Sequence, residues 1–138
     1  MKPTMFLRIA SAVALVQFAA HTFLFVSSSP RHGPEEVAVV EAMKAHRFDF
    51  MGSMRSYWDF YFGYGLEAAF ICLIEAVLLW QLATIAKTGA PMVRPIVALF
   101  CLANIGHAIL TWKYFFITPI VPDVVIAVCL AFAFVAAA

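Results

Sequence analysis

Charged residues are scarce in this chain, and their scarcity excludes most classes of soluble protein. Only 12% of the 138 residues are charged and 64% are hydrophobic, whereas a typical globular domain is about 25% charged. The mean hydropathy is +0.93. The formal net charge is only +1, so the chain lacks the basic field that a nucleic-acid-binding protein needs. The composition therefore predicts an integral membrane protein that does not bind nucleic acid.

Cysteines are also few, and they lie singly within hydrophobic runs at Cys72, Cys101 and Cys129. No CxxC pair is present, so neither a disulfide framework nor a zinc motif is indicated. We interpret the three thiols as small apolar packing residues, a common use of free cysteine.

Four long hydrophobic runs are present, and a membrane-spanning helix needs about 20 residues. The first is longer than the apolar part of a signal peptide and lacks a clean cleavage site, so we expect it to be retained. The predicted fold is all-α: one domain, residues 1–138, forming an antiparallel four-helix membrane bundle. The helices are expected at about residues 5–26, 57–86, 95–112 and 117–137.

Orientation follows from the basic residues near the helix ends. Lys2 and Arg8 precede the first run, and Lys87 and Arg94 lie between the second and third, with no acidic residue on that side. Cytoplasmic loops carry an excess of lysine and arginine. Both termini are therefore expected in the cytoplasm.

The first loop, residues 27–56, is too long for a simple connection between bundle helices. Pro34 followed by Glu35 and Glu36 is a helix-start signature, because proline fits the first turn and acids there complement the helix dipole. Val37 and Val40 continue at near-helical spacing. We predict an amphipathic helix that either lies on the membrane surface or covers the bundle mouth as a lid.

Three ionisable residues, His21, Glu67 and His107, interrupt the apolar runs. At 1.5 Å per residue they lie roughly 5–9 Å outside the centres of their helices, at similar depths. Such groups cost roughly 2.5–3.5 kcal/mol each to insert, and they usually face a bundle interior or mark a site. Glu75 falls on the other side of the centre and is placed outside this layer.

Other polar side chains share faces with these three residues. Gln17 precedes His21 by four residues, Tyr64 precedes Glu67 by three, and Asn104 precedes His107 by three, all helical spacings. Convergent polar groups within apolar walls are typical of ligand pockets. The candidate ligand-binding residues are Gln17, His21, Tyr64, Glu67, Asn104 and His107.

Several functions fit this layer. It could bind a lipid, quinone or other small lipophilic molecule in the outer half of the bundle. It could instead stabilise helix packing in a non-enzymatic accessory subunit, as part of a homo-oligomer or larger membrane complex. His21 and His107 could also ligate haem b or a divalent metal. Whether the protein is an enzyme stays open; Glu67 and His107 are the candidate acid–base pair.

A second cluster lies at the expected outer mouth and comprises Arg47, Arg55, Trp58 and Asp59. Asp59 is expected to pair with Arg55, its i−4 neighbour. The two arginines could attract an anionic head group.

Residues 47–65 read RFDFMGSMRSYWDFYFGYG. This stretch resembles an uncharacterised family of small bacterial four-helix integral membrane proteins. The arrangement is also loosely similar to DoxX-like proteins and sterol-isomerase-type bundles. The resemblance implies a bacterial inner-membrane protein and no particular activity.

Overall fold

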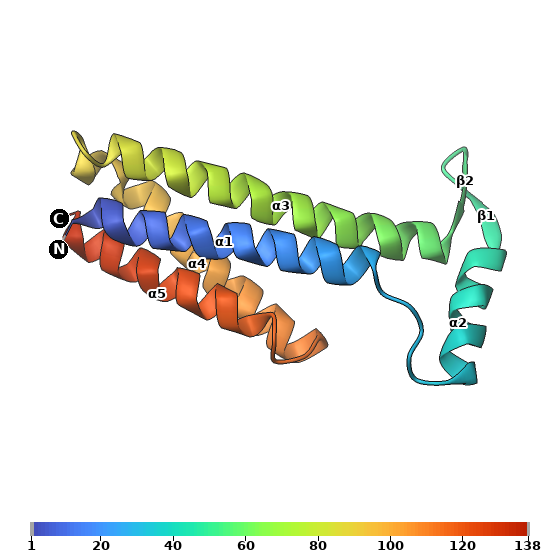
Figure 1. Cartoon of the computed structure of the whole chain (residues 1–138). Coiled ribbons are helices and arrows are strands. Elements are labelled where there is room, and N and C mark those ends of the chain that lie inside the picture. Colours follow the sequence, from blue (N-terminus) through green and yellow to red (C-terminus); the bar gives the residue numbers. More distant parts are fainter. Residues whose placement is uncertain (1, 138) are drawn as a thin grey trace. The chain divides into compact units, whose positions relative to one another are not determined.

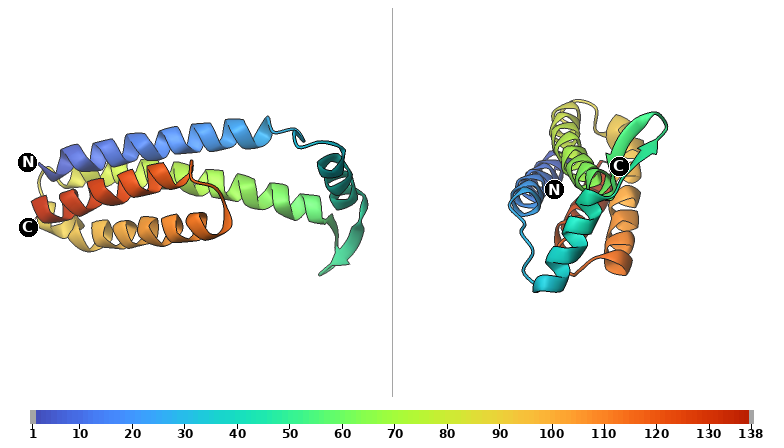
Figure 2. Two further views of the ribbon diagram at one scale, coloured as in Figure 1. Left: turned by 90° about the horizontal axis from the view of Figure 1, so that it is seen from below. Right: turned by 90° about the vertical axis from the view of Figure 1, so that its right-hand side faces the viewer.

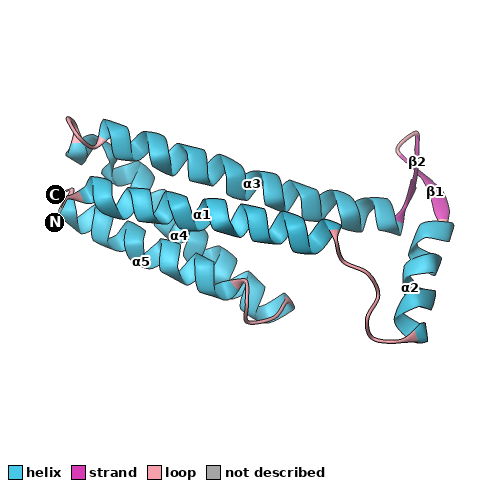
Figure 3. Cartoon of the chain, viewed as in Figure 1, coloured by secondary structure: helices cyan, strands magenta, loops and turns pink. Residues whose placement is uncertain are grey.

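The structure is a computed structural model that describes residues 2–137. Within that range the chain is helical apart from one hairpin and the connecting loops (Figures 1 and 3), which confirms the all-α prediction in its main outline. The elements are α1 Pro3–Val26, α2 Pro34–Ala45, β1 Arg47–Phe50, β2 Ser53–Ser56, α3 Tyr57–Ile85, α4 Ala90–Tyr114 and α5 Ile120–Ala136. By length and composition α1, α3 and α4 are able to cross a membrane; α5 is apolar but shorter, with 17 residues.

The chain divides into two compact units. The first, which we call the helical unit, comprises residues 2–19 and 71–137; the second, the loop unit, comprises Ala20–Phe70. The helices α1 and α3 are continuous and contribute residues to both units.

In the helical unit, segments of four helices share one buried core. Ser11 on α1 donates its hydroxyl proton to the Ala76 carbonyl on α3 at 2.7 Å. Phe6 near the start of α1 stacks on Phe132 near the end of α5, with ring centroids 5.4 Å apart. The two helices therefore run in opposite directions, as do α4 and α5, which pack side by side (Figure 2).

Small residues line this core. Five alanines from three helices are at most 4% exposed: Ala10, Ala14, Ala76, Ala83 and Ala133. Small side chains let helix backbones approach closely, the usual way in which helices pack inside a bilayer. Leu7, Leu79 and Leu130 fill the remaining space and are nearly or fully inaccessible. Ala10 and Ala14 thus mark the face of α1 that packs inward.

Two helix boundaries differ from the sequence expectation because of proline. We expected the third long helix to begin at Pro95, but α4 begins at Ala90 and contains Pro95. Pro95 lies in the second turn, where it removes the hydrogen bond to the Pro91 carbonyl and crowds that carbonyl. The helix nevertheless continues through it to Tyr114. The last helix begins at Ile120 rather than near residue 117, with Pro119 as its N-terminal cap.

The loop unit contains the expected helix, which begins at Pro34, and a β-hairpin that was not expected. The register pairs Phe50 with Ser53, so Met51 and Gly52 form a two-residue turn. Their φ angles are 54° and 82°. Positive φ at both positions is the signature of a type I′ turn, which favours asparagine and glycine. Methionine at the first position gave no turn signal in the sequence.

The start of α3 is fixed by a reciprocal capping interaction. The backbone N–H of Ser56 donates to Asp59 Oδ2 at 2.8 Å, and the backbone N–H of Asp59 donates to the Ser56 hydroxyl oxygen at 3.2 Å. This is a capping box with aspartate in the acidic position. The expected pairing of Asp59 with Arg55 was wrong: among the described residues they form no ion pair, because the helix cap engages the carboxylate.

Candidate functional site

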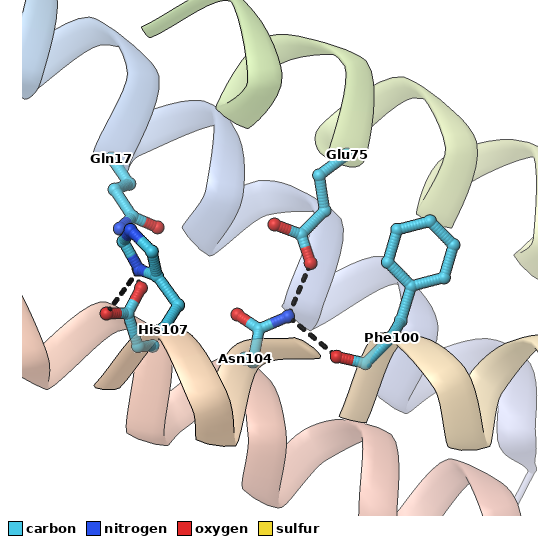
Figure 4. A network of polar contacts seen from close by, with 6 residues as sticks. Gln17, Glu75, Phe100, Asn104 and His107 are labelled. Carbon is cyan, nitrogen blue, oxygen red and sulfur yellow. Dashed lines mark hydrogen bonds and ion pairs between the residues drawn. The ribbon is translucent and has the colours of Figure 1, made fainter. Parts of the chain in front are cut away.

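Asp123, in the first turns of α5, is the centre of a polar cluster inside the helical unit. Figure 4 labels its two partners, Gln17 and His107. Gln17 Nε2 on α1 donates to Asp123 Oδ1 at 2.8 Å, and His107 Nδ1 on α4 lies 2.8 Å from Asp123 Oδ2. The aspartate is 2% exposed. Both of its oxygens are therefore engaged by side chains from other helices.

A second pair extends this cluster. Asn104 Nδ2 on α4 donates to Glu75 Oε1 on α3 at 2.5 Å and to the Phe100 carbonyl at 2.9 Å. Asn104 is 4% exposed, and Figure 4 shows it below Glu75, with His107 on one side and Phe100 on the other. The set Gln17, Glu75, Asn104, His107 and Asp123 is called the polar network below.

The polar network is acidic for a group that lies between apolar helices, with Asn104 and Asp123 buried and the other three side chains partly exposed or exposed. It contains two carboxyl groups and one imidazole, and no lysine or arginine is hydrogen-bonded to it within residues 2–137. A buried charge needs a partner or a proton. The network can therefore hold a proton on the imidazole or on a carboxyl group while its heavy atoms stay in place.

His107 differs from its partner in exposure. Its side chain is 56% exposed, whereas that of Asp123 is 2% exposed. The carboxylate orients the imidazole through Nδ1, and a hydrogen bond at one ring nitrogen sets the tautomer of the other. Within residues 2–137 the second ring nitrogen, Nε2, has no hydrogen-bond partner. With Nδ1 protonated, Nε2 is free to accept a hydrogen bond or a proton from another molecule.

The structure brings together part of the set expected from the sequence. Gln17, Asn104 and His107 meet in the polar network, whereas His21, Tyr64 and Glu67 belong to the loop unit. There, His21 Nε2 lies 3.0 Å from the Gly65 carbonyl oxygen, and the ring stacks on Phe25. Glu67 is exposed and, with Tyr64, lines an open depression on one face of α3.

Sequence reasoning missed Glu75 and Asp123. Glu75 was placed outside the polar layer by depth alone, yet it bonds directly to Asn104. Asp123 was not among the residues predicted for the site. A signal was available, since Asp123 is the one charged residue in the run 117–137 and such residues usually mark a site.

No group of three or more histidine, cysteine, aspartate or glutamate side chains in the described part of the chain is arranged to hold a metal ion. Of the expected haem or metal ligands, His107 has Nε2 available, because Nδ1 is engaged by Asp123. His21 Nε2 is engaged by the Gly65 carbonyl.

The expected mouth residues gather at the hairpin and the start of α3. Arg47 Nη2 and Arg55 Nη1 both donate to the Met54 carbonyl oxygen, each at 3.1 Å. The Lys44 ammonium lies 5.1 Å from the centroid of the Trp58 ring, a cation–π distance.

Glu36 closes the loop that precedes α2. Its Oε2 accepts the backbone N–H groups of Arg31 and His32, each at 2.6 Å. The hydrogen bond from His32, followed by that from Arg31, holds the pKa of Glu36 below its ordinary value, because both bonds favour the ionised carboxylate.

An apolar groove follows the seam between α4 and α5, with a volume of about 430 Å³. Its walls include Ile105, Trp112, Val124 and Val128.

Comparison of the chain with protein-family models, with curated proteins and with solved structures gives no match.

Proposed function

We propose that this chain is a multi-pass protein of the bacterial inner membrane, folded as an antiparallel four-helix bundle with both termini in the cytoplasm. Three helices have the length and apolar composition of membrane spans. Packed against them, α5 is apolar throughout except for Asp123. The resemblance of residues 47–65 to small bacterial membrane proteins supports the same location.

We further propose that the protein binds a small lipophilic or amphipathic molecule through His107 Nε2. The observation that carries this proposal is the contrast within the Asp123–His107 pair: a buried carboxylate fixes a half-exposed imidazole whose second nitrogen has no hydrogen-bond partner within residues 2–137. An imidazole nitrogen facing lipid without a partner is costly. A polar head group would supply that partner.

The pair also restricts the chemistry of the head group. With Nδ1–H donated to Asp123, Nε2 accepts a hydrogen bond, so the ligand should present a hydroxyl group, as a quinol or a hydroxylated lipid does. When the imidazole is protonated, Nε2 donates instead and suits a quinone carbonyl. In a catalytic version of this site, Asp123 takes the place proposed for Glu67 as the partner of His107 in proton transfer.

Lipid analysis of the purified protein tests the proposal. The wild type and His107→Ala are purified in a neutral detergent, extracted, and compared by quantitative mass spectrometry of lipids and quinones. We expect one class of lipophilic molecule to co-purify at near-stoichiometric amounts with the wild type and to fall at least about tenfold in the variant, the effect of losing about 1.4 kcal/mol of binding free energy. His32→Ala removes an exposed imidazole in the loop unit and serves as the control. Equal bound content in all three samples refutes the proposal.

A second function, that of a non-enzymatic accessory subunit, is favoured by the bonds of Gln17 and Asn104. Both amides find their partners inside the chain, as expected for polar groups that only stabilise helix packing. In that case His107→Ala lowers the stability of the protein and leaves the amount of bound lipid unchanged.

The absorption spectrum of the same wild-type sample tests haem binding, because bound haem gives a strong Soret band.

A further inference from the structure

Two arginines of the hairpin converge on one acceptor. Arg47 Nη2 and Arg55 Nη1 each lie 3.1 Å from the Met54 carbonyl oxygen, so the two nitrogens are at most 6.2 Å apart. Each guanidinium carries five N–H donors and a permanent positive charge. Two such groups at this separation repel one another, and the carbonyl that they share is neutral. The Asp59 carboxylate lies near enough to attract both guanidinium groups, and this single negative charge faces two positive ones.

The nearby acids do not form ion pairs with these arginines. Asp59 is engaged by the backbone N–H of Ser56, and Asp49, opposite Met54 in the hairpin register, is exposed. Within residues 2–137 neither guanidinium forms an ion pair. The remaining N–H donors of the two side chains are thus available to an external anion, and phosphate accepts such paired donors well.

The tip of the same hairpin is apolar. Met51 is 91% exposed, and Phe50 and Met54 are 50% and 52% exposed. Met51 also holds a left-handed backbone conformation, with φ of 54°, which costs an L-residue other than glycine roughly 1–2 kcal/mol. The backbone cost is the same in any surroundings, but an exposed methionine side chain is more favourable against a lipid surface than in water.

The hairpin is joined directly to a membrane-spanning candidate. β2 ends at Ser56 and α3 begins at Tyr57, so the four-residue strand extends about 13 Å from the start of α3. The interfacial layer of a bilayer is roughly 5–8 Å thick on each side, so a hairpin of this length brings its tip to the layer by lying along the bilayer surface. Tyr57, Tyr61 and Tyr64 in the first turns of α3 are more than half exposed, typical of the aromatic belt at that layer.

We propose that the hairpin docks on the outer surface of the bilayer, where Arg47 and Arg55 bind the phosphate of an anionic phospholipid head group. The apolar tip at Met51 inserts into the interfacial layer beside that head group. This inference rests on the proposed membrane location of α3 and does not depend on ligand binding at His107.

Native mass spectrometry of the intact protein in a neutral detergent tests the inference. The protein is titrated with short-chain phosphatidylglycerol, and the affinity is read from the lipid-bound species. We expect Arg47→Gln combined with Arg55→Gln to weaken lipid binding about tenfold. The matched control is Arg31→Gln, which removes the same charge from an exposed side chain in the same loop and should change the affinity less than twofold.

Further samples distinguish binding of a lipid head group from binding of inorganic phosphate, and a loss of binding from a loss of folding. Met51→Ser should weaken phosphatidylglycerol binding while leaving binding of inorganic phosphate unchanged, because only the lipid contacts the tip. If the double glutamine variant does not fold, it is replaced in the test by Arg47→Lys and Arg55→Lys, which retain the positive charge. Equal losses in the Arg31 control, or full competition by inorganic phosphate with no effect of Met51→Ser, overturn the inference.

Discussion

Replacement of Asp123 is the most direct test of the polar network. The side chain is 2% exposed and accepts hydrogen bonds from Gln17 and His107. Asp123→Ala leaves both donors without a partner, and each unsatisfied buried donor costs roughly 1–3 kcal/mol. Because the His107 side chain is half exposed, water or lipid head groups recover part of its share. We expect a loss of about 2–4 kcal/mol in the free energy of unfolding.

Asp123→Asn keeps the shape but changes the pattern of donors. The amide oxygen still accepts from Gln17, while the amide nitrogen now faces His107 Nδ1, which accepts only when the ring proton moves to Nε2. We expect a smaller loss of about 1–2 kcal/mol and a switch of the His107 tautomer. Titration with sodium dodecyl sulfate, followed by tryptophan fluorescence, measures the stability, and imidazole ¹⁵N chemical shifts report the tautomer.

Asp49→Asn is the matched control, since Asp49 is exposed on the hairpin. It should change the unfolding free energy by less than about 0.5 kcal/mol. If Asp123→Ala and Asp49→Asn have equal effects, or if the His107 tautomer is the same in the wild type and Asp123→Asn, the described geometry is refuted.

Three further predictions concern other parts of the molecule. Replacing Asn104 or Glu75 alone with leucine should destabilise the protein by about 1–3 kcal/mol, and replacing both should cost less than the sum, as a double-mutant cycle measures. Gly65→Ala should destabilise the loop unit by roughly 1–3 kcal/mol, because the added Cβ overlaps the ring of Phe25, whereas a Cβ at Gly63 meets nothing within 4 Å. Hydrogen bonds from the backbone lower the pKa of Glu36, so the ionised carboxylate stabilises the preceding loop. This stabilisation should be fully present above the ordinary glutamate pKa and should disappear as the pH falls through the lower pKa of the folded state. Amide chemical shifts recorded over a pH titration measure this.

Each of these predictions has a distinct contrary result. Strict additivity in the Asn104 and Glu75 cycle would show that the two side chains do not interact. Equal effects of alanine at Gly65 and at Gly63 would contradict the close approach of Phe25. A Glu36→Gln variant should lose the acid transition of the loop, and persistence of that transition would assign it to another group.

The sequence predicted the helices well because long apolar runs are strong signals. It failed at Ala90, since a proline five residues later suggested a boundary, whereas the helix continues through that proline. It also failed at the hairpin, where Met51 occupies a turn position that asparagine usually signals. Helical spacing correctly placed Asn104 and His107 on the polar side of α4. Spacing gave no information about partners on other helices, so Glu75 and Asp123 became visible only once α3, α4 and α5 were packed.

The small-residue core of the helical unit has a thermodynamic consequence. Ala10, Ala14 and Ala76 are buried against neighbouring helices, and separating those helices inside a bilayer would transfer methyl groups to hydrocarbon rather than to water. Heat capacity rises on unfolding because apolar surface becomes hydrated, and that contribution is small here. Helix separation should therefore show a nearly linear dependence of free energy on temperature, without the curvature that leads soluble domains to denature in the cold.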